Sequence, residues 1–146
     1  MTHLLDVNVL IALVDPRHVF HQAANEWFQR EARASWATCP ITENGLVRIV
    51  GSSRYRNPIG PPSEIMDLLA RLRDMPGHVF WPDSLSLADA TLIDAAALRS
   101  ADQITDTYLL ALAVANGGRL ATFDRRLSPT AVTGGQAALR VIPSAI

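Results

Sequence analysis

The sequence contains no lysine, and all 13 of its basic residues are arginines. Nucleotide-binding loops of the Walker type need a Gly-Lys pair to hold phosphates. Haloacid-dehalogenase-like phosphatases and response-regulator receivers share a strand that ends in Asp, but both use a lysine. The missing lysine therefore argues against all three classes. The formal net charge of −1 adds no global basic signal for nucleic acid.

Cysteine and long hydrophobic runs are also scarce. Cys39 is the single cysteine, which excludes an internal disulfide framework and predicts a small core residue. The apolar runs fall short of the roughly 20 residues that a membrane span needs, and the N-terminus lacks the basic region of a signal peptide. A hydrophobic content of 49% excludes a disordered chain. These features predict one domain, residues 1–146, in the cytoplasm and not in a membrane.

Short apolar segments alternate with amphipathic ones along the chain. The hydrophobic pattern predicts strands at residues 3–7, 35–39, 77–82, 119–123 and 139–143. It predicts helices at residues 9–15, 18–33, 41–52, 63–75, 86–100 and 105–118. Strands that alternate with helices predict an α/β fold, in which helices cover both faces of a largely parallel sheet.

Four acidic residues stand at the ends of elements that are otherwise apolar. Asp6 ends the first strand, Glu43 and Asp106 open helices, and Asp124 follows the strand at residues 119–123. In open parallel sheets, ligands bind beyond the carboxyl ends of the strands, and helix N-termini project to the same edge. We therefore expect the four acids to converge on one small volume.

Each acid taken singly also has a structural explanation. An acid in a first helical turn complements the helix dipole, Asp6 could cap the helix that follows it, and Asp124 could form a turn. Four carboxylates at one edge are harder to explain in this way, because they repel one another without a cation. Oxygen ligands suit Mg²⁺ or Mn²⁺. Such a site suits hydrolysis of phosphodiester bonds, since the metal activates water and stabilises phosphoryl charge.

Four segments of the chain together resemble a known family. In their order and spacing, "LLDVNVLIAL", "TCPITENGLVRI", "QITDTYLLALA" and "LATFDRRL" closely resemble the PIN-domain ribonucleases, and most of all the VapC toxins of bacterial toxin–antitoxin pairs. The resemblance runs from Leu4 to the last strand. It implies a three-layer α/β/α sandwich and a Mg²⁺-dependent endoribonuclease that cleaves structured RNA, such as tRNA or rRNA. It also implies a homodimer that a small VapB-type antitoxin neutralises.

The family's four acids fall on Asp6, Glu43, Asp106 and Asp124. By this resemblance, Asp6, Asp106 and Asp124 ligate Mg²⁺, for which Mn²⁺ can substitute. Glu43 completes the acidic pocket and orients or deprotonates the attacking water.

Three further polar residues lie close to these acids in the sequence. Asn8 fills the polar position two residues after the first acid, and Thr122 fills the hydroxyl position two residues before the fourth. Both are expected to orient the acids from outside the metal's own ligands, although Asn8 could equally be a helix-capping amide. Asp102 either reaches the edge of the site or remains a solvated loop carboxylate.

The loop "SRYRNPIGPP" at residues 53–62 holds Tyr55 between Arg54 and Arg56. An aromatic ring between two arginines could stack on a base while the arginines meet phosphates. A dimer contact or a solvated loop explains the same pattern equally well. Arg48 flanks an acidic motif and could hold a backbone phosphate.

Two other pairs of residues have competing explanations. Arg125 and Arg126 follow the last acid and could hold phosphates or pair internally with an acid. His18 and His21 stand three residues apart without further ligands nearby, which favours a solvated helix face over a zinc site. Taken together, the sequence predicts a metal-dependent endoribonuclease. The alternatives are an antitoxin-free PIN nuclease that acts in RNA maturation or on DNA, and a non-catalytic RNA- or protein-binding module.

Overall fold

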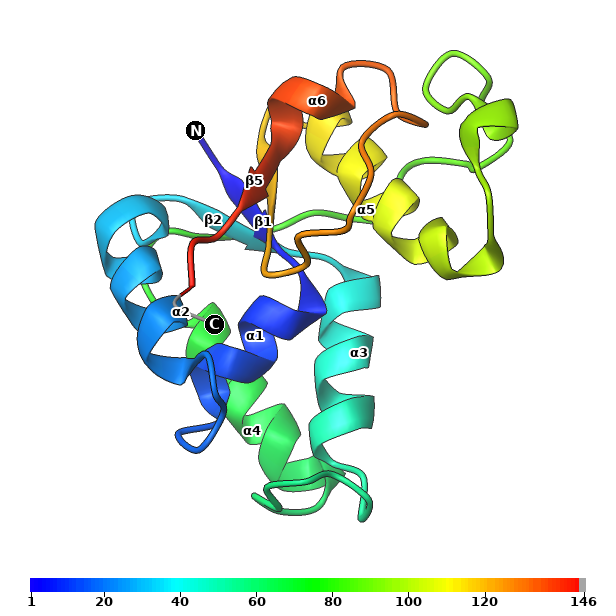
Figure 1. The fold of residues 1–146 in the computed structure, drawn as a ribbon. Helices are drawn as coiled ribbons and strands as arrows, with labels where there is room; N and C mark the ends of the chain where they lie inside the picture. The colour runs from blue at the N-terminus through cyan, green and yellow to red at the C-terminus, as the bar shows by residue number, and fades with distance from the viewer. Residues whose placement is uncertain (145–146) are drawn as a thin grey trace.

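Five short parallel strands form the centre of the computed structural model, which describes residues 1–144 (Figure 1). The strands are β1 (His3–Leu5), β2 (Trp36–Thr38), β3 (His78–Phe80), β4 (Arg119–Thr122) and β5 (Leu139–Val141). Their order in the sheet is β3-β2-β1-β4-β5, and every neighbouring pair is parallel. The chain moves from β1 to one side of the sheet and later returns to the other side at β4. This reversal makes the boundary between β1 and β4 the topological switch point.

Helices cover both faces of this sheet (Figure 1). The longer helices are α1 (Val7–Val14), α2 (His21–Trp27), α3 (Pro40–Val50), α4 (Pro62–Arg73) and α5 (Ile104–Ala115), and α6 (Gly135–Ala138) is a single turn. Leu5 and Trp36 pack with α1 to α4, whereas Leu4 and Leu120 point to the opposite face and pack with α5. The alternation follows from the two-residue period of a strand. The predicted three-layer sandwich with a parallel sheet is therefore confirmed.

Helix α5 is buried on nearly all sides, as its apolar sequence predicts. Its five consecutive residues from Leu109 to Ala113 have no exposed surface. Each fully buried leucine contributes about 1.5–3 kcal/mol relative to an exposed one, so the helix is firmly held. This burial fixes the position of its polar first turn, which carries Asp106.

Residues 86–100, predicted as a helix, form turns instead, so that prediction is wrong. The side chain of Asp89 accepts hydrogen bonds from the backbone N–H and the hydroxyl of Thr91, at 2.9 and 2.6 Å. Such local bonds compete with a helix. The backbone of this segment also pairs with residues 131–133, and the Asp94 N–H donates there at 2.8 Å. Hydrogen bonds to residues 131–133 thus take the place of bonds that a helix would have made.

Other boundaries differ by a few residues from the sequence prediction. The helix predicted at 18–33 begins at His21 and changes after Trp27 into a π-helical segment at Phe28–Ala32. The short helix α6 has no counterpart among the predicted elements, and two 3₁₀ turns occupy Ala95–Ala97 and Ala101–Gln103. None of the helices within residues 1–144 has the length and apolar character that crossing a membrane requires.

Candidate active site

Three aspartates lie at the carboxyl edge of the sheet, around the switch point. Asp6 directly follows β1, Asp124 follows β4, and Asp106 occupies the first turn of α5. Burial, together with the negative charges of Asp6 and Asp124, raises the pKa of Asp106 to about 6. The fold thus brings these three predicted acids close enough for their charges to interact. We call them the aspartate group.

Asp6 is almost fully buried, with 7% of its surface exposed. Its carboxylate accepts hydrogen bonds from the Val7 backbone N–H at 2.7 Å and from the Thr122 hydroxyl at 2.8 Å. Burial raises the pKa of Asp6, these two bonds lower it, and the charge of Asp124 raises it again, with a net upward shift. Asp6 is the N-cap of α1 and a member of the aspartate group, so the two explanations open from the sequence apply together.

Thr122 connects the three elements that carry this edge. Its hydroxyl donates to Asp6 and accepts from the Asn8 amide and from the Asp124 backbone N–H, each at 3.1 Å. The Asn8 carbonyl oxygen in turn accepts from the Phe123 N–H at 3.2 Å. Asn8 therefore braces α1 against the segment after β4.

A hollow of about 330 Å³ opens beside the aspartate group. Asp106 and Asp124 line it together with Asp102 and Arg126. Asp102 is exposed and lines this hollow. It is therefore solvated and also lies at the edge of the site, so both explanations considered from the sequence apply. The backbone of Arg126 donates to Asp124 at 2.9 Å and holds that loop in a turn.

Glu43 lies in the first turn of α3, and its hydrogen-bond partners are Thr38 and Arg73. Its carboxylate accepts from the Thr38 hydroxyl at 2.6 Å and pairs with Arg73 at 3.4 Å. Gly45 faces Val7 so closely that a Cβ there would lie 2.8 Å from a Val7 methyl group. Two residues of α-helix turn the chain by about 200°, so Glu43 points away from the side of α3 that meets α1. These contacts join Glu43 to β2 and α4, and its place in the acidic pocket stays a prediction.

Asp83 is an acid near the site that the sequence pattern of the four acids did not include. It lines a hollow of about 420 Å³ together with Val7 and Thr105, which adjoin Asp6 and Asp106 in the chain. Its signal in the sequence was its place in "HVFWPD", shortly after a strand, as for Asp6 and Asp124. The rule that acids at the carboxyl ends of parallel strands meet at one edge of the sheet would also have identified Asp83.

Tyr55 anchors its loop to the end of α1. Its hydroxyl donates to Asp15, which also accepts from the Asn57 amide at 2.9 Å. Burial raises the pKa of Asp15, but the hydrogen bonds from Tyr55, Asn57 and the Arg17 N–H outweigh it and lower the pKa overall. Asp15 has no exposed surface. The predicted RNA-stacking residue therefore has an internal partner in this fold.

Arg125, His18 and His21 each have an internal hydrogen-bond partner. The Arg125 guanidinium donates to the backbone and side chain of Ser144, at 2.8 and 3.1 Å. His21 donates from Nδ1 to the Ala12 carbonyl at 2.7 Å, and His18 Nδ1 accepts from the Phe20 N–H at 3.0 Å. The two histidines are half-buried and have backbone partners, and His18 lies in the turn before α2.

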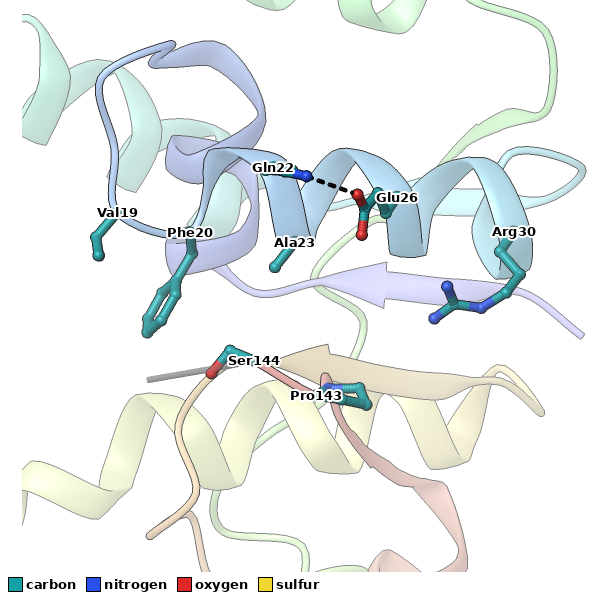
Figure 2. Close-up of a pocket in the computed structure, with 8 residues that line it drawn as sticks. All are labelled: Val19, Phe20, Gln22, Ala23, Glu26, Arg30, Pro143 and Ser144. Carbon is teal, nitrogen blue, oxygen red and sulfur yellow. Dashed lines mark hydrogen bonds between the residues drawn. The ribbon is translucent and has the colours of Figure 1, made fainter.

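A separate hollow of about 480 Å³ lies between α2 and the segment that follows β5 (Figure 2). Phe20 and Ala23 line it from α2 and the turn before it, and Pro143 and Ser144 line it from below in this view. No member of the aspartate group lines this hollow. It therefore belongs to a different part of the surface.

The aspartate group fits a hard divalent ion in its chemistry. Among the described residues, no three His, Cys, Asp or Glu side chains form a ready-made metal cage. Mg²⁺ does not need one, because it keeps several waters and binds through one or two carboxylates. Burial and, after it, the charges of Asp6 and Asp124 raise the pKa of Asp106, and a cation between the carboxylates would relieve the charge contribution.

Comparison with known proteins agrees with this geometry. A model of the PIN domain matches residues 3–132. Ribonuclease VapC44 of Mycobacterium tuberculosis (strain ATCC 25618 / H37Rv) is 48% identical over 134 residues, which cover 92% of this chain and 94% of that protein. Ribonuclease VapC39 of the same strain is 44% identical, covering 92% and 96%, and Ribonuclease VapC38 is 40% identical, covering 83% and 84%. The chain therefore belongs to the PIN domain family and, within it, to the VapC ribonucleases.

Proposed function

We propose that this chain is the toxin of a type II toxin–antitoxin pair and acts as a metal-dependent endoribonuclease in the cytoplasm. The observation that carries the proposal is the aspartate group at the switch point between β1 and β4. Relatives that share 40–48% of its residues carry the name ribonuclease. Substrate RNA is structured, such as tRNA or rRNA, and a VapB-type antitoxin neutralises the enzyme.

Asp6, Asp106 and Asp124 hold Mg²⁺ or Mn²⁺ in this proposal, directly or through water. When bound, the ion lowers the pKa of a water molecule and stabilises negative charge on the phosphoryl oxygens. Thr122 and Asn8 keep Asp6 and the Asp124 loop in place through their hydrogen bonds.

The role of Glu43 as the residue that orients or deprotonates water stays a prediction. Its bonds to Thr38 and Arg73 support a structural role at least as well. A non-catalytic binding module remains the second class of function, but it gives no reason for three mutually repelling carboxylates at one edge.

The test is cleavage of end-labelled tRNA and rRNA by purified protein that has been freed of any bound partner. We expect cleavage with Mg²⁺ or Mn²⁺, none in excess EDTA, and none by the Asp106→Asn variant. Asp102→Asn is the matched control, because Asp102 lines the same hollow but is exposed. Equal cleavage in excess EDTA would contradict the metal-dependent mechanism.

A further inference from the structure

Two hollows lie next to each other on the surface of α3. The first, of about 420 Å³, begins at Val7 and Thr105, and the second, of about 400 Å³, reaches the loop after α3. Arg48 and Ile49 line both hollows, so the two are adjacent. We call this feature the α3 groove. One end lies beside the neighbours of Asp6 and Asp106, and the other lies at the far end of the helix.

The length of the α3 groove suits a short stretch of nucleic acid. Helix α3 has 11 residues, which correspond to about 16 Å at 1.5 Å per residue. A stacked strand rises by about 3.4 Å per nucleotide. The groove therefore spans about five nucleotides, counted from the aspartate group to the loop after α3.

The charge of the α3 groove rises with distance from the aspartate group. Asp83 lines the end nearest the aspartates, Arg48 lies in the middle, and Arg54 and Arg56 line the far end. All three arginines are exposed. Within residues 1–144, no ion pair involves any of them, whereas Arg73 and Arg140 are each paired with a glutamate. Unpaired guanidinium groups along a groove are suited to phosphates.

The loop that carries Arg54 and Arg56 is held in place. Tyr55 and Asn57 both donate to the buried Asp15, and the Arg17 guanidinium donates to the Pro58 carbonyl at 3.3 Å. Less conformational freedom is then lost when a ligand binds. The hydroxyl of Tyr55 thus fixes the loop, and the two flanking arginines are left free to contact a ligand.

We propose that the α3 groove binds the sugar–phosphate backbone of about five nucleotides of single-stranded RNA next to the cleaved bond. Arg48, Arg54 and Arg56 contact successive parts of this strand. The proposal rests on the ribonuclease function proposed above and adds the path of its substrate. It implies that the structured RNA is cut within or beside an unpaired segment.

The test measures binding without cleavage, in EDTA, by fluorescence anisotropy of a labelled ten-nucleotide single-stranded RNA of mixed sequence. We expect Arg48→Ala and the double variant Arg54→Ala/Arg56→Ala to weaken binding about 3- to 10-fold each. The slope of log K against log salt should fall by about 0.7 for each phosphate that the variant no longer neutralises. The double variant Arg33→Ala/Arg99→Ala removes the same charge from exposed positions outside the groove and should bind like the wild type.

A series of three-, six- and ten-nucleotide RNAs tests the length of the site. The wild type should gain affinity mainly up to about five or six nucleotides, and Arg54→Ala/Arg56→Ala should lose the gain beyond three. If the groove variants bind like the control, the proposed path is overturned even when wild-type cleavage is intact. If the wild type fails to cleave RNA at all, the proposed function fails instead. Groove variants that become monomeric with unchanged RNA binding would assign the surface to a protein contact.

Discussion

At the scale of single residues, Thr122 connects three polar groups of the site through one hydroxyl. It donates to Asp6 and accepts from Asn8 and from the Asp124 backbone, so it uses its full capacity for hydrogen bonds. Asp6 is buried, and burial raises its pKa. The hydroxyl therefore orients the buried carboxylate of Asp6, which would cost free energy if it had no hydrogen-bond partner.

Asp106→Asn tests how burial and the neighbouring charges of the aspartate group affect stability. The folded-state pKa of Asp106 is raised from 3.8 to about 6. A carboxyl group whose pKa is raised by folding destabilises the protein least below its unfolded pKa. The protein then loses stability as the pH rises through the folded-state pKa. In EDTA, we therefore expect the variant to melt higher than the wild type near neutral pH, by roughly 3–5 °C. The advantage should grow from pH 4 to about 6 and then level off.

Thermal melts with EDTA and with Mg²⁺ across this pH range make the measurement. Added Mg²⁺ should stabilise the wild type more than the variant, because a ligand stabilises only the native state that it occupies. Asp102→Asn serves as the control and should shift the melting temperature little. Identical melting curves for Asp106→Asn and the wild type in all conditions would show that neither burial nor the neighbouring charges make ionised Asp106 destabilising.

At the scale of elements, Glu43 on α3 and Asp83 after β3 have different surroundings. Glu43 points toward Thr38 and Arg73, and Arg73 also lies over the ring of Phe80 at 4.8 Å. Asp83, in contrast, lines the hollow beside the neighbours of Asp6 and Asp106. Asp83 therefore lies beside the neighbours of two site acids, whereas the hydrogen bond and the ion pair of Glu43 join it to β2 and α4.

The variants Glu43→Gln and Asp83→Asn distinguish these two acids. From the contacts in the structure, Glu43→Gln should lower the free energy of unfolding by about 1 kcal/mol, because a half-buried charged pair is weakened, and should retain cleavage. Asp83→Asn should leave stability within about 0.5 kcal/mol and reduce cleavage of RNA. Rates under single-turnover conditions and urea titrations give both quantities. Loss of cleavage in a stable Glu43→Gln protein would instead support the role predicted for Glu43 from the sequence.

A second link between elements joins the π-helical segment to the edge strand β5. The Arg140 guanidinium donates to both carboxylate oxygens of Glu31, at 2.7 and 3.2 Å. These bonds from Arg140 lower the pKa of Glu31. A carboxyl group whose pKa is lowered by folding stabilises the protein above its unfolded pKa. This contribution is lost as the pH falls through the folded-state pKa.

We expect Arg140→Ala to lower the free energy of unfolding by about 0.5–1.5 kcal/mol at pH 7. The difference from the wild type should shrink when the pH falls below the unfolded pKa of Glu31 and through its lowered folded pKa. Urea titrations at pH 7 and at acid pH measure it. Arg33→Ala, an exposed arginine nearby, is the control. A difference independent of pH would show that Arg140 acts by packing and not by its charge.

At the scale of the whole molecule, the sheet order brings the two ends of the chain together. Asp6 follows the first strand and Asp124 follows the fourth, and these strands are neighbours in the sheet. The Thr122–Asp6 bond joins residues 116 positions apart. An active site of this kind needs the complete fold, because neither half of the chain contains all three aspartates.

We expect the protein to be a homodimer in solution. The resemblance to VapC toxins implies this state, and the edge strand β3 leaves Val79 and Phe80 partly exposed, at 42% and 39%. Size-exclusion chromatography with light scattering should give twice the chain mass of 15.9 kDa. A single-chain mass at every concentration would contradict the expectation.

The sequence by itself determined much of this protein. Periodicity located all five strands and the buried helix α5, and the rule of strand ends located Asp6 and Asp124. It failed at residues 86–100, because the pattern of apolar residues there cannot show that residues 131–133 will pair with their backbone. It also could not show that Tyr55 bonds to Asp15, 40 positions away.

Only the tertiary structure decided which acids face one another. In the sequence, Glu43 and Asp106 look alike, since each opens an apolar helix. The close packing of Gly45 against Val7 sets the rotation of α3 and turns Glu43 toward Arg73. Burial of α5 on nearly all sides fixes its first turn, and Asp106 there lies near Asp6 and Asp124 instead. Local sequence fixes where a helix begins, but contacts between elements fix its rotation, and the direction of each carboxylate follows from that rotation.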